Sequence, residues 1–155
     1  MSSAKPDRKP MIALVRTAYR AFQQHMLSGA QARGRAGLKP AHDAVFALLG
    51  DEGVRAADLA ARAGITRQSM GEVIRDMVGL GLLEMVPDPD DGRAKIVRYT
   101  AEGKQFAYAG YRHLRYLEER FEEEFGDDYE AARRVLERVV ELLDEVDALG
   151  EVQGS

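Results

Sequence analysis

The chain has 155 residues, of which 45% are apolar, so we expect one domain of residues 1–155 with a core of its own. It contains no cysteine, which excludes a disulfide framework, a thiolate metal site and a cysteine redox switch. Its apolar stretches are too short to span a membrane and its first ten residues are charged, so the sequence predicts a soluble cytoplasmic protein without a membrane partner.

The charge of the chain is unevenly distributed, and this distribution matters more than the net charge of −4. Residues 1–39 hold eight Lys or Arg and one acid, whereas residues 99–155 hold seven Lys or Arg and fifteen acids. A basic region can bind phosphate groups while an acidic region faces away from them. The net charge therefore does not exclude a nucleic-acid partner.

The first predicted element is an amphipathic helix over about residues 11–29, in which apolar residues recur at intervals of three and four. Residues 29–37 follow as a glycine-rich basic connection, which we interpret as a solvated loop in preference to a phosphate contact. Pro40 suits the first position of a second helix. Residues 54–55 are interpreted as a short extra strand beside a later hairpin.

The next stretch has the spacing of a helix-turn-helix. Residues 56–63 form its first helix, and Gly64 provides the turn because glycine adopts a positive φ angle without a Cβ clash. Ile65 is predicted to be a buried apolar plug. Thr66 is predicted to be the N-cap of a second helix over residues 66–79, which we name the recognition helix. A helical hairpin of this kind also occurs in ordinary all-α cores, so this stretch alone does not decide the function.

A two-stranded ribbon over residues 84–99 follows, and we name it the wing. Apolar and polar residues alternate along it, which suits a ribbon with one buried face. The predicted buried residues are Leu83, Met85, Val97 and Tyr99. Prolines and aspartates prevent regular pairing at the tip, so Arg93 is predicted to begin the returning strand. A helix-turn-helix followed by such a ribbon is a winged helix, here residues 38–100.

Two long amphipathic helices are predicted after the wing. Thr100 caps the first helix, and Gly126 separates it from the last, which begins with an acidic capping box at residues 127–130. The winged unit is too small to bury the apolar faces of these helices. Residues 11–29 and 101–149 are therefore predicted to be N- and C-terminal dimerisation helices that pair with a second copy of the chain. The predicted fold class is mainly α with a small β-hairpin wing.

Several segments occur in the order and spacing of a known family. They are Leu38–Ala41, Asp58–Ala60, Gly64–Ser69, Gly79–Leu83 and Asp88–Lys95. On these segments, from Leu38 to Gly103, the chain resembles the MarR family of bacterial transcription regulators. Lys39 departs from the helix-capping Ser or Thr that is usual in the family, and Tyr99 replaces a common leucine. The resemblance implies a homodimeric repressor that binds a palindromic operator in double-stranded DNA.

The candidate DNA-binding residues are Thr66, Arg67, Gln68, Ser69, Glu72, Arg75, Asp91, Arg93 and Lys95. The recognition helix is expected in the major groove, where Gln68 can bond to adenine and an arginine to guanine. Arg93 is expected in the minor groove, where a narrow A·T-rich groove concentrates negative potential. Asp90 or Asp91 is predicted to orient Arg93, or its neighbour Arg98, by an ion pair.

The resemblance also implies a small aromatic or phenolic effector in the cleft between the dimer helices and the DNA-binding unit. The candidate ligand-binding residues are Tyr19, Phe22, His25, Met26 and Phe46. The alternative, which we favour, is that these side chains are simply part of the core, because apolar seams normally pack against protein.

Other classes of function fit the sequence less well. The sequence has no P-loop, no dinucleotide-binding fingerprint and no HExxH motif, so we predict neither an enzyme nor a cofactor. His25, His42 and His113 lie in three predicted helices; we interpret them as surface or half-buried residues, with a metal-responsive regulator as the alternative. A winged helix used only for protein interaction or dimerisation is a further alternative. It would present apolar or acidic residues, whereas this recognition helix presents Arg67 and Gln68.

Overall fold

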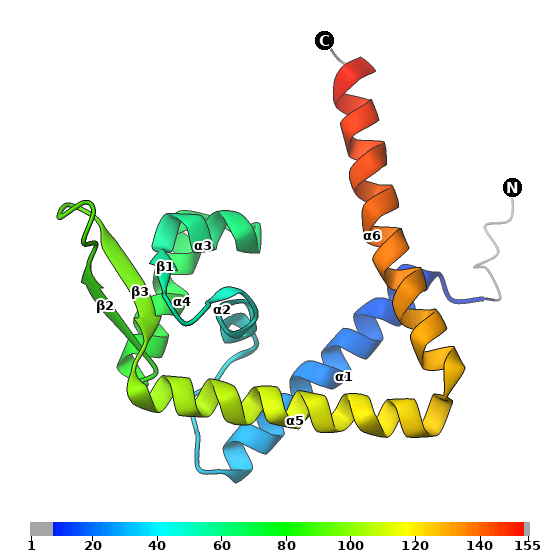
Figure 1. The fold of residues 1–155 in the computed structure, drawn as a ribbon, viewed down its shortest axis with the longest axis horizontal. Helices are drawn as coiled ribbons and strands as arrows, with labels where there is room; N and C mark the ends of the chain where they lie inside the picture. Colours follow the sequence, from blue (N-terminus) through cyan, green and yellow to red (C-terminus); the bar gives the residue numbers. More distant parts are fainter. Residues whose placement is uncertain (1–7, 154–155) are drawn as a thin grey trace, which may run out of the picture. The chain divides into compact units, whose positions relative to one another are not determined.

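The computed structural model describes residues 8–153, and it describes side chains over residues 8–146. Residues 1–7 and the side chains of residues 147–149, to which the sequence predictions extend, lie outside this part. The helices are α1 (Met11–Ala32), the short 3-10 helix η1 (Pro40–His42), α2 (Asp43–Leu48), α3 (Ala56–Ala63), α4 (Arg67–Gly79), α5 (Ala101–Phe125) and α6 (Asp127–Gln153). The strands are β1 (Val54–Arg55), β2 (Leu83–Pro87) and β3 (Lys95–Tyr99) (Figure 1).

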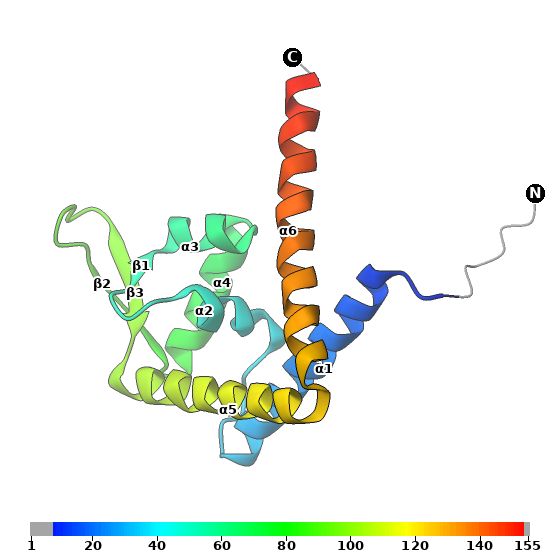
Figure 2. The same cartoon turned by 45° about the vertical axis from the view of Figure 1, so that its right-hand side comes forward.

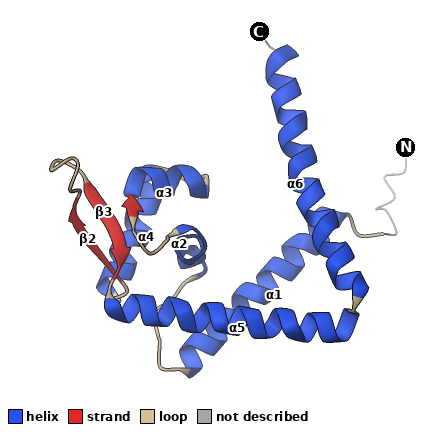
Figure 3. Ribbon diagram, viewed as in Figure 1, coloured by secondary structure: helices blue, strands red, loops and turns tan. Residues whose placement is uncertain are grey.

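This architecture confirms the predicted fold class, a mainly helical chain with a small β-hairpin wing (Figure 3). The described residues divide into two compact units, with the boundary between Gly110 and Tyr111. Within the described residues, no helix is both long and apolar enough to cross a membrane.

The first unit contains a three-stranded antiparallel sheet in the order β1-β3-β2, and the predicted extra strand is its third member. Val97 of the central strand lies opposite Val54 on one side and Met85 on the other. Val97 is fully buried, but Met85 is 43% exposed, so the prediction that Met85 is buried was wrong. Leu83 of the same edge strand is buried at the base of the hairpin, so the exposure of Met85 reflects its place further along a hairpin that extends away from the helices of the core (Figure 1).

The core of this unit is assembled from α2, α3, α4 and the sheet. Its buried residues are Val45, Leu49, Leu59, Ala60, Met70, Ile74, Met77, Leu82, Leu83 and Val97. The recognition helix contributes one face to this core, because Met70, Ile74 and Met77 follow each other at intervals of four and three. The hairpin of β2 and β3 extends away from these helices, and its tip lies free of them in both views (Figures 1 and 2).

The turn of the helix-turn-helix forms as predicted in its backbone but not in its side chains. Gly64 has φ +65°, and the N–H of Ile65 donates to the carbonyl of Ala60 at 3.1 Å, which ends α3. The side chain of Ile65 is 40% exposed, so it is not the buried plug that we predicted. Its backbone hydrogen bond, and not its side chain, closes the turn.

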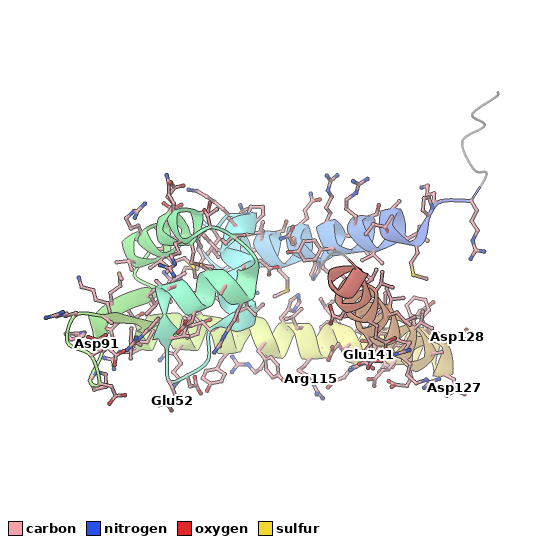
Figure 4. The ribbon with its side chains drawn as sticks, turned by 90° about the horizontal axis from the view of Figure 1, so that it is seen from above. Glu52, Asp91, Arg115, Asp127, Asp128 and Glu141 are labelled. Carbon is pink, nitrogen blue, oxygen red and sulfur yellow. The ribbon has the colours of Figure 1, made fainter. Side chains whose placement is uncertain are left out.

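Three predicted boundaries differ from the structure. Helix α1 continues beyond Gly29 to Ala32, and the first residue with a positive φ angle is Gly34 (φ +81°), two residues after its end. Arg93 lies in the turn of the hairpin, where its N–H donates to Asp91 Oδ1 at 3.1 Å, and the returning strand begins at Lys95. Helix α6 begins at residue 127, so its acids occupy the first turn instead of forming a capping box, and they complement the helix dipole there (Figure 4).

The second unit is formed by the end of α5 and by α6. At the bend between these helices, the ring of Phe121 lies 6.3 Å from that of Phe125 and 6.2 Å from that of Tyr129. Both helices leave large apolar side chains exposed. These are Tyr111, Leu114, Tyr116, Phe125, Val135, Leu136, Val140, Leu142, Leu143 and Val146. The predicted amphipathic pattern is therefore present, with an apolar face that the single chain does not bury.

Candidate nucleic-acid interface

The recognition helix begins with a side-chain cap, as the sequence predicted. Thr66 has an extended backbone, and its Oγ1 accepts a hydrogen bond from the N–H of Ser69 at 3.1 Å. The same hydroxyl donates to Ser69 Oγ at 2.8 Å. The cap fixes the first turn of the helix and holds both hydroxyl groups at its exposed end.

The outer face of the helix and its cap carry six of the nine residues that the sequence proposed as DNA contacts. Thr66, Arg67, Gln68, Ser69, Glu72 and Arg75 are exposed. A Cβ atom placed on Gly71 would lie 3.4 Å from Arg75 Nη1, so the guanidinium group lies back along the helix over this glycine. The sequence prediction did not assign Gly71 a role. A glycine inside a helix costs about 1 kcal/mol relative to alanine, so its presence in the recognition helix is the sequence feature that could have indicated a special role for Gly71.

The wing tip is organised by Asp88, which the sequence prediction did not single out. Asp88 is only 6% exposed. Its Oδ2 accepts hydrogen bonds from Arg55, with Nε at 2.7 Å and Nη2 at 2.6 Å, and its Oδ1 accepts the N–H of Asp90 at 2.9 Å. The N–H of Asp90, and then the Arg55 guanidinium, hold the pKa of Asp88 below its usual value.

The ion pairs predicted at the tip have different partners in the structure. Asp91 Oδ1 accepts the backbone N–H of Arg93, and Asp91 Oδ2 lies 3.8 Å from Arg55 Nη2. Arg98 pairs instead with Glu84 across the hairpin, at 2.7 Å. The prediction of an Asp90 or Asp91 ion pair with Arg93 or Arg98 was wrong because residues directly opposite in a hairpin, such as Glu84 and Arg98, are closer than the tip acids.

Of the positively charged side chains of the wing, those of Arg93 and Lys95 form no ion pair with another described residue, whereas Arg98 pairs with Glu84. Arg93 and Lys95 are both exposed, as is Asp91, which lies at the outer end of the hairpin (Figure 4). A guanidinium and an ammonium group near the tip suit contact with phosphates and with a narrow minor groove.

A polar cluster behind the recognition helix links it to the start of α2. His42 is 1% exposed, so the interpretation of this histidine as a surface or half-buried residue was wrong. Its Nδ1 accepts the N–H of Lys39 at 3.2 Å, and its Nε2 lies 3.7 Å from Asp76 Oδ2 of α4. Lys39 Nζ also bonds to Asp76. Burial lowers the pKa of His42 and so favours the neutral ring, in which Nδ1 is free to accept the N–H of Lys39.

The candidate ligand-binding residues do not share one environment. Tyr19 and Phe22 of α1 are exposed, and the Tyr19 hydroxyl donates to Asp43 Oδ2 at 2.8 Å; this hydrogen bond raises the pKa of Tyr19. His25 is exposed, and Met26 is partly buried. Phe46 packs against the core, with its ring 6.3 Å from that of Tyr99 and 5.7 Å from that of Phe106.

Within the part of the chain that the structure describes, no three His, Asp or Glu side chains gather in a group that could hold a metal ion. The alternative of a metal-responsive regulator therefore gains no support there.

Comparisons with known proteins point to one family. Residues 36–94 match the model described as the MarR family. No curated protein matches the chain. Among solved structures, the chain is similar to the transcriptional repressor CouR bound to a 23-mer DNA duplex, with 24% identity and a TM-score of 0.66 over 90% of this chain and 99% of that one.

Two further structures share the fold. The PcaV transcriptional regulator from Streptomyces coelicolor, in complex with its natural ligand, is 25% identical with a TM-score of 0.59, and the match covers 90% of this chain and 96% of that one. Wild-type MarR from E. coli, in its apo form, is 12% identical with a TM-score of 0.66, and the match covers 86% of this chain and 98% of that one.

Proposed function

The chain belongs to the MarR family through the winged helix-turn-helix of residues 36–94, and on this basis we propose that it is a homodimeric repressor that binds a palindromic operator. Members of this family are DNA-binding transcription regulators and not enzymes. The observation that carries the proposal is the capped recognition helix, whose outer face is polar and exposed while its inner face is held by the core.

The recognition helix supplies the side chains for the major groove. Gln68 and Arg75 are the groups suited to base edges, since an amide bonds to adenine and a guanidinium to guanine in a bidentate manner. Arg67 follows the cap directly and is placed for a phosphate contact. Thr66, Ser69 and Glu72 complete this surface. A winged helix specialised for protein interaction would show an apolar or acidic outer face here, and this helix shows neither.

The wing supplies the minor-groove contact. Arg93 and Lys95 are exposed beside the tip, and Asp91 fixes the backbone of Arg93 by accepting its N–H. An arginine that enters a narrow groove gains affinity from the negative potential and responds to groove width without reading a single base.

Dimerisation is supported by the apolar side chains that the single chain leaves exposed. Helix α1 exposes Ile12, Leu14 and Val15, and α5 and α6 expose the larger set described above. Exposed apolar surface of this extent marks an interface, and a second copy is the simplest partner. A dimer would place two recognition helices on half-sites about 34 Å apart, which requires a palindromic operator.

Release by a small aromatic effector is the remaining part of the proposal. Tyr19, Phe22, His25 and Met26 of α1 are the candidate contacts, because at least two of them expose aromatic surface. PcaV, which has the same fold, was solved with its natural ligand. If no aromatic acid of a library releases operator DNA or shifts the melting temperature, this part of the proposal should be abandoned.

The experiment that tests the DNA-binding mechanism is the substitution Arg93→Ala, measured on a duplex selected from a random pool by the wild-type protein. We expect weaker binding to sites with A·T-rich flanks, and a slope of log affinity against log salt that is smaller by about one. Arg98→Ala is the matched control, because Arg98 is exposed on the same hairpin but pairs with Glu84. If Arg93→Ala changes neither affinity nor salt slope, the wing has no part in binding.

A further inference from the structure

One side chain connects the wing tip to the opposite edge of the sheet. Arg55 of β1 lies opposite Ile96, and Ile96 lies opposite Val86 on its other side, so these three residues form one row across the sheet. Asp88 follows directly after the end of β2, two residues beyond Val86, and its side chain is buried on the side that Arg55 reaches. The Arg55 guanidinium therefore reaches past the central strand and places both Nε and Nη2 on Asp88 Oδ2.

The tip that Asp88 anchors is closed by its own hydrogen bonds. The N–H of Asp88 donates to the carbonyl of Ala94 at 3.0 Å, and the N–H of Ala94 donates to the carbonyl of Asp91 at 2.8 Å. Asp88 Oδ1 accepts the N–H of Asp90, and Asp91 Oδ1 accepts the N–H of Arg93. Since these bonds link residues 88–94 into one unit, a shift of Asp88 also shifts Arg93.

The other end of the connection is part of the helix-turn-helix. Arg55 is the residue immediately before α3, and it occupies the N-cap position of that helix with an extended backbone. Its position is therefore fixed by α3 and, through the core, by the recognition helix. Arg55 is also surrounded by acids, because Asp88, Asp91 and Asp58 all stabilise its charge. A guanidinium so neutralised is poorly suited to be a phosphate contact itself.

We propose that Arg55 is a positioning residue that sets the orientation of the wing tip, and thereby of Arg93, relative to the recognition helix on duplex DNA. This inference rests on the proposed function. It assigns Asp88 the role of the wing's anchor, held by Arg55 from one side and by the N–H of Asp90 from the other.

A positioning role for Asp88 and a purely electrostatic role predict opposite changes in DNA affinity for one substitution. Asp88→Asn removes a negative charge from a DNA-facing hairpin, so electrostatics alone predicts tighter binding. Positioning predicts weaker binding. If the Asn oxygen keeps the hydrogen bond from the N–H of Asp90, its NH₂ group faces the N–H donors of Arg55, and the contact that anchors the tip is lost. Arg55→Met weakens binding under both accounts and is informative only together with Asp88→Asn.

The experiment compares full-length wild-type protein with Arg55→Met, Asp88→Asn and Arg93→Ala, on duplexes with A·T-rich or G·C-rich flanks around one half-site pair. Dissociation constants are measured by fluorescence anisotropy at several salt concentrations. We expect the two anchor variants, Arg55→Met and Asp88→Asn, to lose the preference for A·T-rich flanks by up to about tenfold, as Arg93→Ala does. We also expect Arg55→Met to cause no further loss of this preference when Arg93 is already alanine, which a general loss of stability would not produce.

The matched controls are Arg98→Met and Glu84→Gln, which make the same charge changes in an exposed pair on the same sheet. Arg55→Lys keeps the charge but not the forked donor, and it should lose most of the flank preference. If Arg55→Met does not fold, Arg55→Lys and Asp88→Asn carry the test alone.

Tighter binding by Asp88→Asn, to the extent seen with Glu84→Gln, would overturn the inference. An unchanged flank preference in both anchor variants would also overturn it while leaving the proposed function intact. A wild-type protein that binds no duplex would overturn the proposed function and this inference with it.

Discussion

The buried histidine predicts how stability depends on pH. The neutral ring of His42 accepts the N–H of Lys39 at Nδ1. Protonation of Nδ1 would make it a donor that faces the N–H of Lys39, so this hydrogen bond would be lost. Burial lowers the pKa of His42 from its ordinary value of 6.5, with Asp76 opposing the shift and Lys39 adding to it. In the unfolded chain, the histidine takes up a proton near pH 6.5. In the folded protein, it does so only at a lower pH.

The sign and the size of the effect follow from proton linkage. Between the folded pKa and 6.5, the unfolded state binds more protons than the folded state, so the free energy of unfolding falls as the pH is lowered through this interval. One proton contributes a slope of at most about 1.4 kcal/mol per pH unit. Once the pH is below the folded pKa, His42 causes no further loss.

The substitution His42→Gln tests this account. The amide oxygen of Gln can accept the N–H of Lys39, and its NH₂ group can donate toward Asp76, yet it does not titrate in this range. We expect the variant to lose the decrease in stability below pH 6.5 that the wild type shows, measured by urea denaturation at pH 8.0, 7.0, 6.0 and 5.5. His25→Gln, on the exposed surface of α1, is the matched control. If the slope survives in His42→Gln and disappears in His25→Gln, the assignment to the buried ring is wrong.

Two further predictions concern single side chains. Thr66→Ala removes the cap that accepts the Ser69 N–H, so it should lower the free energy of unfolding by about 1 kcal/mol and weaken DNA binding. Thr66→Ser keeps the hydroxyl and should do neither. Urea denaturation and titration of operator DNA distinguish the two variants. Tyr99→Phe removes a buried hydroxyl without a hydrogen-bond partner among the described residues, so it should leave the melting temperature unchanged or raise it. A clear decrease in the melting temperature would show that the hydroxyl has a partner. Burial also raises the pKa of Tyr99 to about 12, and near-UV titration should show a late-ionising tyrosine that is absent from Tyr99→Phe.

The sequence predicted best those features that are set by residues close together in the chain. The limits of α3 and α4 follow from Gly64 and Thr66, since a positive φ angle ends one helix and a hydroxyl begins the next within three residues. The cap of α5 is equally local: Thr100 Oγ1 accepts the N–H of Gly103 at 2.9 Å. In both cases, the chemistry of the capping residue is sufficient to locate the boundary.

Features that depend on distant residues were not predictable in the same way. Ile65 and Met85 continue the apolar pattern, but burial requires a second layer that the pattern does not reveal, and both are exposed. The partner of Asp88 lies on another strand, so pairing the tip acids with the nearest arginines in sequence gave the wrong ion pairs. The register of the sheet was needed to bring Arg55 to the wing.

The charge at the wing tip shows why this distant residue matters for function. Residues 88–95 contain three acids, Asp88, Asp90 and Asp91, and two bases, Arg93 and Lys95. Considered alone, the tip is therefore negative, which opposes contact with phosphates. Arg55 supplies the missing positive charge, and it does so at the inner side of the tip, on Asp88 and toward Asp91. The acids are thus neutralised from within the protein, which leaves Arg93 and Lys95 to act outward.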